Sequence, residues 1–179
     1  MRADIGHRLR DLPHLARRFF WSLRAPEPDA DDEAWLLSLL SPAERDLYGA
    51  QPTVDRAHSV ACAVAARDGL ADPRVELIVA SALHDVGKAA AGLGTFGRVA
   101  ATVVDAVVPE AINRRMTVES GGLRHRMVLY ARHDHVGSEL LREAGSADVA
   151  VAWALEHHRS EAGWSIAPEV GRVLLAADG

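Results

Sequence analysis

The stretch from residue 75 to residue 88, VELIVASALHDVGK, decides the fold of this chain. It is mostly apolar up to Leu83, and the preceding Asp72-Pro73 is a typical helix opening, so a helix is expected up to Gly87. Near its end the run meets His84-Asp85, two polar side chains that are costly to bury unless they converge on a partner. Neighbouring helical residues point about 100° apart, so the pair can flank an ion lying between their directions. The stretch therefore predicts a buried helix that ends at a polar site.

Helix start and stop residues recur along the rest of the chain, whereas alternating β-branched or aromatic runs are scarce. Ser41-Pro42-Ala43-Glu44 is a capping box, Thr53 and Ser146 are candidate N-caps, and Gly69 and Gly145 are candidate left-handed helix ends. The sequence predicts an all-α protein. Besides the helix described above, helices are expected over residues 3–24, 31–40, 53–69, 96–108, 123–131, 134–144, 147–158 and 168–178, and a further helix is expected to begin at Pro42.

Composition narrows the class of protein. The chain has 179 residues, 49% of them apolar, and a formal net charge of -5, which fits one globular domain and argues against broad nucleic-acid binding. Its apolar runs fall short of the roughly 18 residues that a membrane span needs, and charges interrupt the first residues, so a cytoplasmic protein is expected. Cys62 is the only cysteine and is expected to be a buried thiol. Any metal ion would therefore be bound by imidazole and carboxylate.

The order of histidines and aspartates carries the functional information. His58 lies within a predicted helix, His84-Asp85 ends the apolar run, His133 follows Arg132, and His157-His158 and Asp178 end later helices. This order resembles the HD superfamily of metal-dependent phosphohydrolases over about residues 53–178. It is nearest to the two-metal branch of that superfamily, to which the HD-GYP phosphodiesterases belong. The resemblance implies a helical bundle, which we expect at 41–179. Residues 1–40 lie outside the matched region and are expected to form an N-terminal helical extension.

The resemblance also implies one or two divalent transition-metal ions. His58, His84, Asp85 and Asp178 would bind the first ion, and Asp85 would bridge to a second ion held by His133, His157 and His158. Imidazole with carboxylate suits iron, manganese, zinc, nickel or cobalt. An activated hydroxide would then cleave a phosphomonoester or a phosphodiester. The expected substrate is a nucleotide or a related phosphorylated compound.

Three of these assignments have alternatives. His135 competes with His133, which is favoured because it stands four residues before Gly137, as in the family. One of His157 and His158 can orient the other by contacting it, instead of binding an ion itself. Asp178 is next to last in the sequence and can be a solvated helix end.

Lys88 is the only lysine among twenty basic residues, and it follows Asp85 by three positions. The resemblance implies that Lys88 contacts the scissile phosphate and that Asp85 is the central catalytic residue. Alternatively, Lys88 is a positive charge that the dipole at a helix C-terminus favours. Arg132 and Arg159 are expected to neutralise further phosphate charge.

The residues after His157-His158 depart from the family, because no Gly-Tyr-Pro segment follows them. The substrate is therefore open. Two other functions fit the same residues: a non-catalytic module that binds a nucleotide signal, and a di-iron oxygenase. The amphipathic N-terminal segment is a candidate surface for a protein partner or for self-association.

Overall fold

The computed structural model describes residues 27–92, 126 and 129–179. Over these residues the chain is helical and has no strand, which confirms the all-α prediction. The helices expected over 3–24 and 96–108, and most of the one over 123–131, lie outside the described residues. The elements are α3 (Ala30–Leu39), α4 (Pro42–Gly49), α5 (Thr53–Gly69), α6 (Val75–Leu83), α7 (Gly87–Ala90), α11 (His133–Glu143), α12 (Asp148–Glu156), the 3₁₀ turn η1 (Glu161–Gly163) and α13 (Pro168–Asp178).

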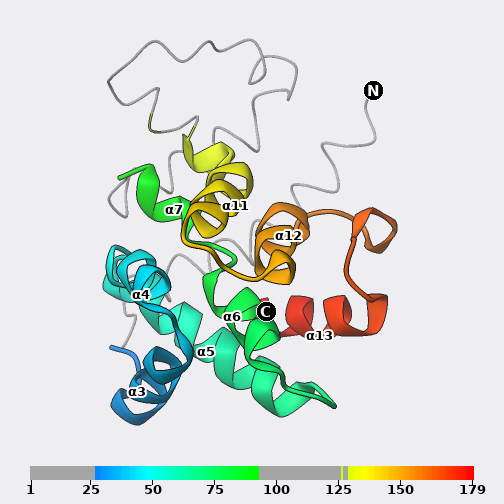
Figure 1. Ribbon diagram of the computed structural model, residues 1–179, viewed down its shortest axis with the longest axis horizontal. Helices are drawn as coiled ribbons and strands as arrows, with labels where there is room; N and C mark the ends of the chain where they lie inside the picture. The colour runs from blue at the N-terminus through cyan, green and yellow to red at the C-terminus, as the bar shows by residue number, and fades with distance from the viewer. Residues whose placement is uncertain (1–26, 93–125, 127–128) are drawn as a thin grey trace, which may run out of the picture.

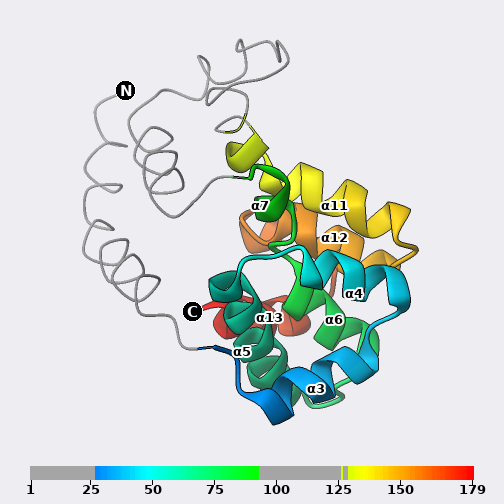
Figure 2. The same ribbon diagram turned by 90° about the vertical axis from the view of Figure 1, so that its left-hand side faces the viewer.

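Helix α6, formed by the apolar run, is the central helix of the bundle (Figures 1 and 2). Every residue from Leu77 to Leu83 is buried, because α6 packs against α5 on one side and α12 on another. Helix α13 packs on α5, and α11 packs on α12 and α7. An apolar stretch with no polar face is stable only when other helices surround it, so burial of α6 fixes the arrangement of the bundle.

Helix α3 belongs to the same hydrophobic core. Leu36 is fully buried and Leu40 is nearly so, both within the cluster that contains α6. The proposed division at residue 40 stays a prediction, since the structure does not describe residues 1–26. Among the described helices, none is long and apolar enough to cross a membrane.

The helix ends follow the sequence in part. The Ser41 capping box forms as predicted, with the Ser41 amide donating to Glu44 Oε2 at 2.9 Å. Gly145 has a positive φ of 72°, as expected of a left-handed helix end. Gly69 ends α5 without a positive φ, and Thr53 is the first residue of α5, not its cap. Ser146 does not cap α12, because its hydroxyl donates to Glu44 Oε1 at 2.7 Å and Ala147 takes the cap position.

Candidate metal centre

A tight turn between α6 and α7 places the His84-Asp85 pair at the centre of the molecule. Helix α6 ends at Leu83, earlier than expected, and the chain then turns through His84, Asp85 and Val86 before α7 begins at Gly87. The Lys88 amide donates to the Asp85 carbonyl at 2.9 Å and closes this turn. Both His84 and Asp85 are buried. The turn therefore directs two adjacent polar side chains into the interior of the bundle.

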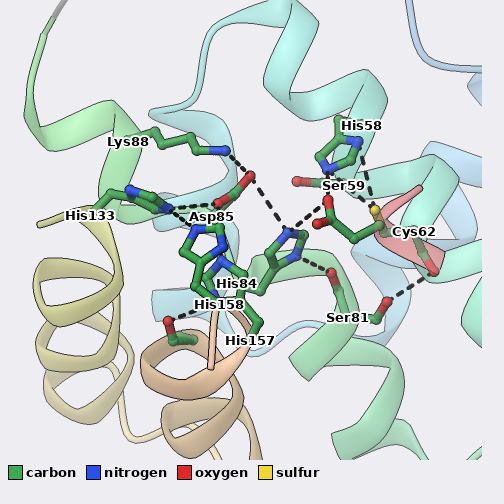
Figure 3. A network of polar contacts seen from close by, with 12 residues as sticks. His58, Ser59, Cys62, Ser81, His84, Asp85, Lys88, His133, His157 and His158 are labelled. Atoms are coloured by element: carbon green, nitrogen blue, oxygen red, sulfur yellow. Dashed lines mark hydrogen bonds and ion pairs between the residues drawn. The ribbon is translucent and has the colours of Figure 1, made fainter. Parts of the chain in front are cut away.

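Residues from five regions of the chain meet at this turn (Figure 3). They form two groups, and within each group the candidate ligand atoms lie within 4.8 Å of one another. The first ligand group is His58, His84, Asp85 and Asp178, and the second ligand group is His133, His157 and His158. The structure thus brings together all seven side chains that the sequence suggested as metal ligands.

Asp85 lies between the two groups. Its Oδ1 atom is 3.3 Å from His133 Nε2 and 3.8 Å from His157 Nε2, both in the second ligand group. Its Oδ2 atom is 3.5 Å from His84 Nε2 in the first group. One carboxylate therefore presents an oxygen to each group, as a bridging ligand would.

The first ligand group joins α5, the turn and the last helix. Asp178 Oδ1 lies 3.0 Å from His58 Nε2 and 3.4 Å from His84 Nε2. Burial alone would raise the pKa of Asp178, but the hydrogen bond with His58 and the nearby His84 lower it below its ordinary value. Burial alone would lower the pKa of His84, but the charges of Asp85 and Asp178 raise it. Asp178 is therefore an ionised member of the group at neutral pH.

The second ligand group is formed by imidazoles alone. His133 and His158 face each other with their Nε2 atoms 3.0 Å apart. Burial, together with the charges of His84 and His158, lowers the pKa of His157 to about 3. His158 is partly exposed to solvent, but its ring lies against His133, and the pKa of His158 is also lowered, by desolvation of the ring and by the charge of His133. His157 and His158 are therefore neutral at physiological pH, which is the state in which histidine binds a metal ion.

Backbone carbonyls orient three of the rings. The Nδ1 atoms of His84, His133 and His157 lie 2.7, 2.9 and 3.0 Å from the carbonyl oxygens of Ser81, Tyr130 and Ala154, respectively. A carbonyl oxygen only accepts, so each Nδ1 carries the proton. In the neutral ring the Nε2 lone pair then faces the centre of the cluster, an arrangement that is usual for metal-bound histidine.

Three buried polar atoms in this cluster have no hydrogen-bond partner among the described residues: His84 Nε2, Asp85 Oδ1 and His157 Nε2. Leaving such atoms unsatisfied is costly in a protein interior, so most of those seen in native structures are satisfied by an ion or a water. Cations held by the two ligand groups would satisfy all three. Nitrogen and carboxylate donors in this combination fit a divalent transition metal.

Lys88 contacts Asp85 Oδ2 directly and is mostly buried. Burial alone would raise the pKa of Asp85, but the charges of Lys88 and His84, together with the nearby His133, hold it well below its ordinary value. Arg132 and Arg159, the other candidate phosphate ligands, are exposed, and Arg159 lies 3.6 Å from Glu156. Lys88 is therefore the cation that the structure places in the cluster itself.

The competition between His133 and His135 has a structural answer. His133 is buried against Asp85, whereas His135 is exposed on the other side of α11. The nearby Gly137 lies where α11 crosses α7. A Cβ on Gly87 would lie within 3 Å of both the His133 carbonyl oxygen and the Gly137 amide nitrogen. A Cβ on Gly137 itself would lie 3.2 Å from the Gly87 amide nitrogen, so the glycine four residues after His133 stands at the same close contact.

Sequence reasoning did not connect Cys62 with the cluster. The thiol is fully buried, as expected, and its Sγ lies 3.5 Å from His58 Nε2. The spacing of four residues from His58 on one helix was the available indication.

Comparisons of the chain with protein-family models, curated proteins and solved structures found no match. The resemblance to the HD superfamily therefore depends on the order of the ligand-type residues, and the geometry of the site is independent of it.

Proposed function

We propose that this protein is an HD-type metal-dependent phosphohydrolase that acts on a nucleotide or a related phosphorylated substrate. The observation that carries the proposal is the convergence of seven histidine and aspartate side chains, Asp85 among them, with three buried polar atoms that lack hydrogen-bond partners among the described residues. A cluster of this kind is expensive to bury without a cation. Metal binding is therefore the first step of the proposal, and hydrolysis is the second.

The first ligand group offers two carboxylates and two imidazoles, and the second offers three imidazoles and shares Asp85. When bound at such sites, divalent ions lower the pKa of water and polarise a phosphoryl group. The contribution of the chain is to hold Asp85 ionised and His157 neutral at physiological pH. Both side chains are then ready to bind a cation without first exchanging a proton.

Lys88 would contact the phosphate. It is the one lysine of the chain and is already seated beside Asp85. Its compact ammonium group suits a single phosphate oxygen, whereas the exposed Arg132 and Arg159 can reach other parts of an anionic substrate. We assign Lys88 to the scissile phosphate and the two arginines to the remaining negative charge.

Metal content is the direct test. We expect protein purified without chelator to contain about two ions per chain by elemental mass spectrometry. The variant His133→Ala should contain about one ion. His135→Ala is the matched control and should contain as many ions as wild type, because His135 is exposed. Turnover of p-nitrophenyl phosphate and of bis-p-nitrophenyl phosphate should then distinguish monoesterase from diesterase activity.

Other outcomes would change the conclusion. One ion in all three proteins would reduce the centre to the first ligand group. No ion after metal addition would overturn the proposal and favour a non-catalytic nucleotide-binding module. Iron with oxygen consumption and no phosphate release would favour a di-iron oxygenase.

A further inference from the structure

Ser81 makes a hydrogen bond that is unusual for a serine within a helix. A helical serine usually bonds to a carbonyl one turn earlier in its own helix. Ser81 lies on α6 and is 1% exposed, and its hydroxyl instead donates to the carbonyl oxygen of Cys62 on α5 at 3.1 Å. The side chain of Ser81 therefore joins two different helices inside the core.

The backbone of Ser81 contacts the candidate centre as well. Its carbonyl oxygen accepts the Nδ1 proton of His84 at 2.7 Å. This bond leaves Nε2 of the ring facing Asp85 and Asp178. Ser81 thus contacts α5 through its side chain and orients a histidine of the first ligand group through its backbone.

Cys62 continues the connection to the other histidine of the first ligand group. Its Sγ atom lies 3.5 Å from Nε2 and 3.7 Å from Nδ1 of His58, against the imidazole ring. Polar contacts therefore run from His58 through Cys62 and Ser81 to His84, across the contact between α5 and α6 (Figure 3).

Such a connection matters because metal ligands must be placed within about 0.2 Å of their ideal distances. His58 and His84 come from different helices, so a small slide of α5 along α6 would separate them. Apolar packing alone resists sliding weakly because it has no direction, whereas a buried hydrogen bond has a defined length and angle.

We propose that Ser81 is a positioning residue of the first ligand group. It fixes α5 against α6 at Cys62 and so sets the separation of His58 from His84. The inference rests on the part of the proposed function that assigns a metal ion to this group, and it does not depend on the substrate.

The test compares two buried serines. Ser81→Ala removes the bond to Cys62 and keeps the Ser81 backbone carbonyl. Ser59→Ala is the matched control, since Ser59 is also 1% exposed and its hydroxyl contacts Gln51 Oε1 at 3.4 Å, outside the connection from His58 to His84. Zn²⁺ affinity of the full chain is measured by competition with a chelating dye, beside the thermal stability of the metal-free protein.

We expect Ser81→Ala to lower the affinity for the more tightly bound Zn²⁺ ion by about 10- to 100-fold. This is the usual effect of losing a group that supports a metal ligand. Ser59→Ala should leave that affinity unchanged. The loss of thermal stability of the metal-free protein should be comparable in Ser81→Ala and Ser59→Ala. Ser81→Thr, which keeps the hydroxyl, should restore most of the affinity. Ser81→Cys, which nearly keeps the volume of the side chain and replaces the hydroxyl by a much weaker donor, should also weaken binding of this ion, and it serves as the second variant if Ser81→Ala fails to fold.

Equal Zn²⁺ affinities of Ser81→Ala and Ser59→Ala would overturn the inference while leaving the metal centre in place. In the second variant, an unchanged affinity for Ser81→Cys would do the same. Absence of Zn²⁺ binding by wild type would instead overturn the proposed function, and the inference with it.

Discussion

The carboxylate of Asp85 faces the imidazole ring of His133, with Oδ1 3.3 Å from Nε2. The other oxygen, Oδ2, faces His84 and contacts Lys88. Among the residues that the structure describes, Asp85 is therefore the one side chain that faces both ligand groups with separate atoms. Its removal should affect both groups at once, which no other substitution in the cluster is expected to do.

Asp85→Asn keeps the shape of the side chain and removes its charge. We expect the variant to lose both ions and to lose turnover by about three orders of magnitude, because electrostatic contributions of this kind are among the largest in catalysis. Elemental mass spectrometry and p-nitrophenyl phosphate turnover are the measurements. Asp46→Asn, at an exposed position on α4, is the control. Retention of two ions would show that Asp85 is not a bridging ligand.

Lys88→Met should separate metal binding from substrate binding. The substitution removes a positive charge beside Asp85, so the affinity for metal ions should be retained or increased. Turnover should fall by about 10- to 100-fold, because a phosphate contact is lost. Metal content and steady-state kinetics of the same preparation are compared. If Lys88→Met loses metal as Asp85→Asn does, Lys88 acts through Asp85 and not on the substrate.

Gly87→Ala should destabilise the protein through the contact between α7 and α11. The added Cβ would lie 2.6 Å from the Gly137 amide nitrogen, and backbone atoms cannot move aside cheaply. Overpacking of this kind costs about 1–3 kcal/mol of the free energy of unfolding. Gly49→Ala is the control, since its Cβ would meet nothing within 4 Å. Chemical denaturation measures both, and equal stability of the two variants would contradict the close crossing.

The metal-free protein should lose stability in acid through His157. The folded protein keeps this ring neutral down to a pKa of about 3, against an ordinary value of 6.5. Between these values the unfolded chain binds the extra proton, so the free energy of unfolding falls as the pH is lowered from 6.5 towards 3. His157→Gln should show a smaller slope over this range, measured by denaturation in the presence of chelator. A slope equal to that of wild type would show that folding does not depress the pKa of His157.

Removal of bound metal should lower the melting temperature of the whole bundle. The ligands come from α5, the turn after α6, α11, the end of α12 and α13, so an ion would tie these helices together. At a free concentration of 100 times Kd, one ion stabilises the folded state by about 2.7 kcal/mol. Scanning calorimetry with and without EDTA measures the shift, and re-addition of metal should reverse it. An unmoved melting curve would count against both ligand groups.

The sequence alone determined the helical class and much of the candidate site. The apolar run before His84 predicted a buried helix, and the capping box at Ser41 is a local interaction that its four residues complete by themselves. The order of the histidines and aspartates suggested the seven residues that the structure brings together. These features are readable because helix periodicity and capping depend on residues only a few positions apart.

Tertiary structure decided which partner each polar side chain takes. Ser146 is of a residue type that often caps helices, but its hydroxyl donates to Glu44, and the hydroxyl of Ser81 donates to Cys62 on a neighbouring helix. The early end of α6 and the contact of Lys88 with Asp85 depend likewise on what surrounds the turn. Sequence patterns report interactions within one helix, whereas a buried hydrogen bond forms with whichever group packing brings into reach. The order of the ligand-type residues was therefore present in the sequence, and the geometry that unites them around Asp85 came only from the packing of α5, α6, α11, α12 and α13.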